Sequence, residues 1–123
     1  MSPGTAGSAG KPAPRLDNLS ELIVKHVRER PERIAVGTSD LQLILGYRQL
    51  DELVRSASAQ LAQLGVRQGD VIALISDNTV EFVVSLLALL NSGAMVAPLN
   101  PALTESELHV RLSELPVRAL LVP

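Results

Sequence analysis

The spacing of apolar residues predicts a series of short helices and strands that begins near residue 18. Leucine, isoleucine and valine recur every three or four residues over 19–27 and over 50–64, which is typical of helices with one buried face. Continuous apolar runs at 71–75 and 94–99 predict strands buried on both faces. A third strand is expected at 118–122.

Residues that start and end helices divide the first part of the chain. Asn18 precedes the first apolar series and Pro31 follows it, so a helix is expected between them. A second helix is expected from Tyr47, because Gln49 lies three residues after Gly46 in an arrangement like a capping box. Its buried face is expected to hold the apolar residues Leu50, Leu53, Val54, Ala57, Leu61 and Leu64, with Gly65 as the C-terminal cap.

The second part of the chain alternates strands with helices. A polar turn at 76–79 predicts the start of a buried helix over 80–90, which Gly93 ends. Thr104 and Glu107 form a capping box for a further short helix. The order strand, helix, strand, helix, strand over 71–122 predicts an α/β fold: a layered parallel sheet with flanking helices.

The expected strands at 34–36 and 41–45 add a small β-hairpin before this sheet. Residues 1–16 are rich in Gly, Ser, Ala and Pro, so they are expected to form a disordered tail, and residues 17–123 to form one folded unit.

Composition excludes several classes of function. The chain has no cysteine, which rules out disulfides, thiolate zinc sites and a cysteine nucleophile. Eleven basic and thirteen acidic residues give a net charge of -2, which argues against nucleic acid as a partner. The apolar run at 83–90 is too short to span a bilayer, and no signal peptide is recognised.

The candidate chemistry lies where strands end, because ligands of parallel sheets bind at the carboxyl ends of the strands. The loops at 76–79 and 100–104 occupy those places, yet Asp77 disfavours an anion and no glycine-rich phosphate loop is present. His26 is expected to face solvent. Glu105 and His109, four residues apart, are expected to pair at the surface rather than to bind a metal.

Four segments, taken in order and spacing, resemble the adenylate-forming acyl-CoA synthetases, also called AMP-dependent synthetases. They are residues 46–50 (GYRQL), 64–71 (LGVRQGDV), 78–82 (NTVEF) and 93–101 (GAMVAPLNP). The runs NTVEFV at 78–83 and APLN at 97–100 are most similar to 4-coumarate-CoA ligase-like and oxalate-CoA ligase-like members. Gly46 departs from the pattern, since many relatives carry Thr there.

The resemblance implies that residues 17–123 form the N-terminal part of a larger adenylate-forming fold. Such an enzyme joins a small carboxylic acid to AMP using ATP and Mg²⁺, and then transfers the acyl group to coenzyme A. No position in this chain matches the family's phosphate loop, adenine site or catalytic lysine. We therefore expect no catalytic, cofactor-binding or metal residue here, a turn role for Asn100, and no activity from the chain alone.

Two other functions remain open at this point. One is a non-catalytic interaction or regulatory module, which would pair with a relative or with itself through an uncovered sheet edge. The other, a free-standing nucleotide-binding domain, is disfavoured by the missing phosphate loop. The expected compartment is the cytoplasm or the peroxisomal matrix.

Overall fold

The computed structural model describes residues 20–123, so the tail predicted for 1–16 and the cap predicted at Asn18 lie outside the described residues. Helices and strands follow in the order α1 (Ser20–Glu29), β1 (Ile34–Gly37), β2 (Ile44–Gly46), α2 (Tyr47–Gln63), β3 (Val71–Ile75), α3 (Val80–Asn91), β4 (Met95–Leu99), α4 (Glu105–Ser113) and β5 (Ala119–Leu121). Every predicted element within the described residues is present.

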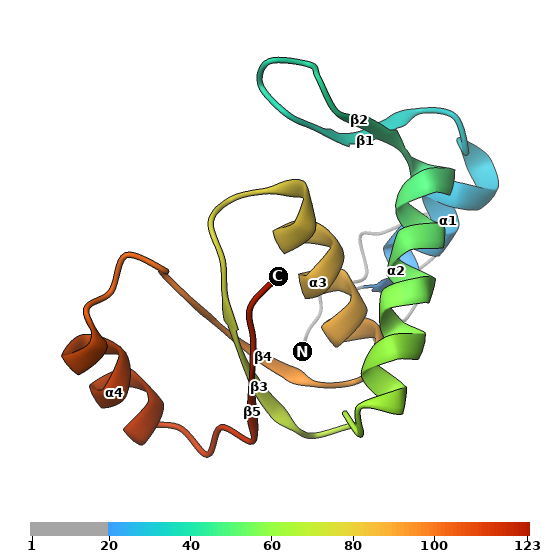
Figure 1. Cartoon of the computed structure of the whole chain (residues 1–123). Coiled ribbons are helices and arrows are strands. Elements are labelled where there is room, and N and C mark those ends of the chain that lie inside the picture. The colour runs from blue at the N-terminus through green and yellow to red at the C-terminus, as the bar shows by residue number, and fades with distance from the viewer. Residues whose placement is uncertain (1–19) are drawn as a thin grey trace, which may run out of the picture.

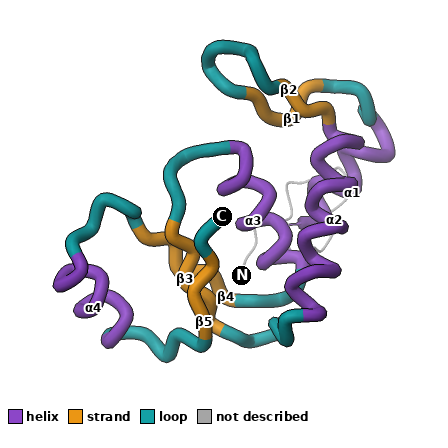
Figure 2. Tube along the Cα trace, viewed as in Figure 1, coloured by secondary structure: helices purple, strands orange, loops and turns teal. Residues whose placement is uncertain are grey.

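The three later strands form one parallel sheet in the order β4-β3-β5. Ile72 in the central strand lies opposite Val96 on one side and Ala119 on the other. Figure 1 shows α1, α2 and α3 on one side of this sheet and α4 on the other side. The β1–β2 hairpin is antiparallel and stands apart from the sheet, beyond the first turn of α2 (Figure 2). The predicted α/β class is therefore confirmed.

The core lies between β3 and the two long helices. Ile72 and Leu74 of β3 are almost fully buried, as is Leu89 of α3. These side chains pack in one cluster with Leu50, Val54 and Leu61 of α2 and with Ala88 and Ala94. Burying one such leucine contributes about 1.5–3 kcal/mol to the free energy of unfolding. Ala73, whose side chain points to the opposite face of the sheet, is also fully buried, so the central strand is buried on both faces, as its continuous apolar run predicted.

The second apolar strand is not buried as predicted. β4 lies at the edge of the sheet, and Met95 exposes 62% of its surface. Proline is tolerated at such an edge, since it has no N–H to contribute to a further strand, and Pro98 lies within β4. Apolar composition alone does not distinguish an edge strand from a central one, and for this reason the prediction that β4 is buried on both faces was wrong.

The hairpin is also shorter than predicted, because residues 41–43 form part of its loop. Thr38 and Asp40 hold this loop: the Leu43 N–H donates to Thr38 Oγ1 over 3.1 Å, and the Gln42 N–H donates to Asp40 Oδ1 over 3.0 Å. Leu41 takes a φ of 61°. Local side-chain bonds to the backbone thus replace strand pairing here.

The apolar faces of the first two helices are narrower than predicted. In α2 the buried residues are Leu50, Val54 and Leu61, whereas Leu53 lies on the exposed flank. Leu64 follows the last turn of α2 and is 79% exposed. In α1, Ile23 packs against the core but Leu22 is exposed.

Two glycines end the long helices as predicted. Gly65 and Gly93 have φ values of 94° and 77°, a left-handed conformation that other residues adopt only at a cost. After each glycine the next N–H returns to the last helical turn: Val66 donates to Leu61, and Ala94 donates to Leu89. These caps direct the chain into the turn before β3 and into β4.

Candidate functional site

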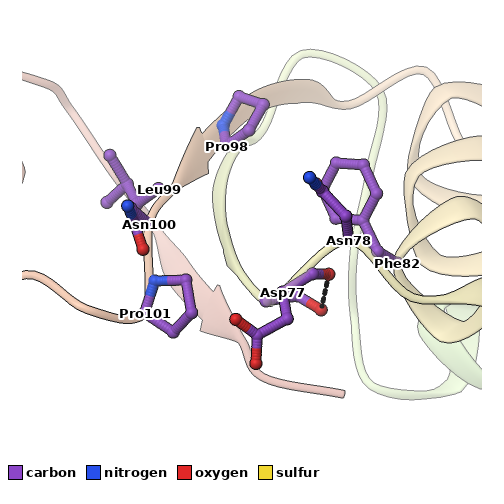
Figure 3. A pocket seen from close by; sticks show the side chains of 8 residues that line it. Asp77, Asn78, Phe82, Pro98, Leu99, Asn100 and Pro101 are labelled. Atoms are coloured by element: carbon purple, nitrogen blue, oxygen red, sulfur yellow. Dashed lines mark hydrogen bonds between the residues drawn. The ribbon is translucent and has the colours of Figure 1, made fainter.

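The loops that follow β3 and β4 meet at one end of the sheet. Between them lies a cavity of about 390 Å³, shown in Figure 3, that is lined by Ser76, Asp77, Asn78, Phe82, Pro98, Leu99, Asn100 and Pro101. A neighbouring hollow of about 440 Å³ shares Asp77 and Pro101 and extends to Val122 and Pro123, beyond β5. The two loops at the carboxyl ends of β3 and β4 therefore border one cavity, to which residues 76–78 and 100–101 contribute.

The polar groups of the first loop are largely used to hold its own shape. Ser76 Oγ donates to the Asp77 carbonyl over 2.9 Å, the dashed line in Figure 3, and the Thr79 N–H donates to the same oxygen over 2.9 Å. Thr79 Oγ1 then accepts from the Phe82 N–H over 3.1 Å and caps α3. The predicted start of this helix after the polar turn at 76–79 is confirmed.

Asn100 has the turn role that the sequence predicted. Its Oδ1 accepts from the Ala102 N–H over 2.8 Å, and its carbonyl accepts from the Leu103 N–H over 3.2 Å. An asparagine that bonds to the backbone two residues later favours a tight turn. Asn100 therefore turns the chain out of β4, and its amide lines the cavity.

The charge of the cavity does not suit a nucleotide. The lining residues include the exposed carboxylate of Asp77 but no lysine, arginine or histidine. A triphosphate is bound by cationic side chains or by a glycine-rich loop. Among residues 20–123 there is also no group of three or more acidic or histidine side chains arranged to hold a metal ion. The described residues do not fit ATP or Mg²⁺.

A carboxylate that accepts three hydrogen bonds lies at the opposite end of the sheet. Asp70, just before β3, accepts from the Arg67 N–H over 2.7 Å and from Arg118 Nη1 over 3.1 and 2.9 Å. The bond from Arg67, followed by the contact with Arg118, holds the pKa of Asp70 below its ordinary value. The pair joins the starts of β3 and β5, a contact that could not be predicted because residues 70 and 118 lie far apart in the sequence and no local pattern links them.

Both predictions for the histidines are wrong. His26 does not face solvent: its ring stacks on Tyr47 with centroids 4.9 Å apart, and its Nδ1 is buried without a hydrogen-bond partner. Position 26 falls on the side of α1 that faces the start of α2. Glu105 and His109 are both exposed on α4, and neither is a member of the ion pairs found within the described residues.

No helix within residues 20–123 is both long enough and apolar enough to cross a membrane.

Comparison with known proteins gives a consistent set of matches. A family model described as AMP-binding enzyme matches residues 23–123. Oxalate--CoA ligase of Arabidopsis thaliana is 37% identical over 105 residues, which are 85% of this chain and 20% of that protein. A plipastatin synthase polypeptide of Bacillus subtilis is 32% identical over 88% of this chain and 4% of its own length.

A solved structure extends the match to three dimensions. Klebsiella oxytoca NpsA, in complex with 3-hydroxyanthranilyl-AMSN, superimposes with a TM-score of 0.82 at 25% identity. The match covers 88% of this chain and 22% of that one. The chain therefore spans between 4% and 22% of the length of these three relatives.

Proposed function

The chain belongs to the AMP-binding enzyme family, and from this membership we propose that it forms part of an ATP-dependent acid-CoA ligase. Such an enzyme activates a small carboxylic acid as an acyl-adenylate and then forms a thioester with coenzyme A. The role of this chain is to supply the sheet edge and loops around the cavity at 76–79 and 98–101.

One observation carries the choice of a CoA ligase over a peptide synthetase. The chain is 37% identical to oxalate--CoA ligase and 36% identical to probable CoA ligase CCL9 of Humulus lupulus, against 26–34% for the plipastatin synthase and four other peptide synthetases. The matched stretches are of nearly equal length, so the identities are comparable.

The cavity explains why we propose that the chain alone is inactive. Its lining offers Asp77 and two asparagine amides but no cation for a phosphate group. ATP, Mg²⁺ and coenzyme A would then be held by parts of a longer enzyme that lie outside this chain. Most of the pocket for the carboxylic acid would also lie in those other parts. We propose the cytoplasm or the peroxisomal matrix as the compartment of the enzyme.

A grafting experiment tests the proposal. Residues 21–123 replace the aligned segment of oxalate--CoA ligase in one chimera and that of the plipastatin synthase in another, while the chain alone serves as a third sample. We expect CoA-thioester formation from the first chimera and no ATP–pyrophosphate exchange from the chain alone. Activity restricted to the peptide synthetase chimera would overturn the CoA ligase assignment, and exchange by the chain alone would overturn its inactivity. Circular dichroism of both chimeras controls for folding.

A second candidate function, an interaction module, is favoured by the outer edge of β5. No strand among residues 20–123 covers that edge, and Leu120 in β5 and Val122 just after it expose 49% and 66% of their surfaces. Two copies of β5 meeting edge to edge would continue the sheet across a two-fold axis. We propose this edge as the site of self-association, because Pro98 makes the β4 edge less suitable.

Light scattering coupled to size-exclusion chromatography tests self-association. We expect a dimer mass for the natural chain and a monomer mass for Leu120→Lys, since a charged side chain on an edge strand opposes pairing. Leu64→Lys is the matched control, because Leu64 is also exposed but lies at the end of α2. A monomer mass for the natural chain at every concentration would exclude self-association through this edge.

A further inference from the structure

We draw no further inference here: the strongest candidate, the apolar groove of about 400 Å³ that Leu43, Leu53 and Val84 line between the β1–β2 hairpin, α2 and α3, is an unpartnered surface, and nothing in the structure shows what covers it.

Discussion

Asp70 makes the stability of the chain depend on pH. Because its hydrogen bonds to Arg67 and Arg118 lower its pKa in the folded state below the ordinary value of 3.8, the carboxylate stabilises the fold above that value. The contribution is lost as the pH falls through the lowered pKa. We expect Asp70→Asn to reduce the drop in thermal unfolding midpoint between about pH 6 and about pH 3.

Glu52→Gln provides the control for this measurement, since Glu52 is exposed on α2 and far in sequence from both strand starts. It removes one negative charge, as Asp70→Asn does. An equal change of the pH dependence in both variants would assign the effect to net charge rather than to the bonds of Asp70.

Replacing Gly93 or Gly69 with alanine allows backbone strain to be distinguished from a steric clash of the added Cβ. Both have a positive φ, but a Cβ at Gly93 would lie 2.9 Å from Gln68 Cγ, whereas a Cβ at Gly69 meets nothing within 4 Å. We expect Gly69→Ala to lower the free energy of unfolding by about 1–2 kcal/mol through backbone strain alone. Gly93→Ala should lower it by about 1 kcal/mol more. Urea unfolding measures both, and equal losses would show that Gln68 moves aside freely.

At the scale of whole elements, the stability that a helix cap contributes depends on how many core residues its helix supplies. Thr79 caps α3, which contributes Val80, Ala88 and Leu89 to the core, whereas Thr104 caps α4, which has no buried residue. We expect Thr79→Ala to lower the free energy of unfolding by about 1 kcal/mol. Thr104→Ala should change it little, because α4 can fray without opening the core.

Thr79→Ser retains the capping oxygen and should restore most of the loss, as measured by urea unfolding followed by circular dichroism. If the serine variant were as unstable as the alanine variant, the methyl group of Thr79 rather than its hydroxyl would be responsible.

Elements could be predicted from the sequence where their signals are local. The cap at Thr104, the polar turn at 76–79 that starts α3 and the glycine ends at Gly65 and Gly93 depend on neighbours within a few residues, and each was predicted. The length of β2 was predicted wrongly, because the side chains of Thr38 and Asp40 bond to the backbone of residues 42–43 and compete with strand pairing. Apolar composition does not reveal this competition.

On the scale of the whole molecule, prediction was limited by strand order. The exposure of Met95 follows from the place of β4 at the edge, and no spacing in the sequence gives that place. The stacking of His26 on Tyr47 likewise depends on how α1 packs on α2. The position of the cavity was predictable, since every parallel sheet brings its strand ends together, but its lack of a cation became clear only when its lining was known.

The order of the sheet has a consequence for synthesis on the ribosome. β3 is the central strand, yet both of its neighbours follow it in the chain, and the Asp70–Arg118 bond spans 48 residues. A chain that emerges from its N-terminus therefore presents the most apolar strand before either partner exists. During that interval α2, which precedes β3 in the chain and packs against it in the fold, is available to cover it. We expect slow translation between β3 and β5 to favour aggregation over folding.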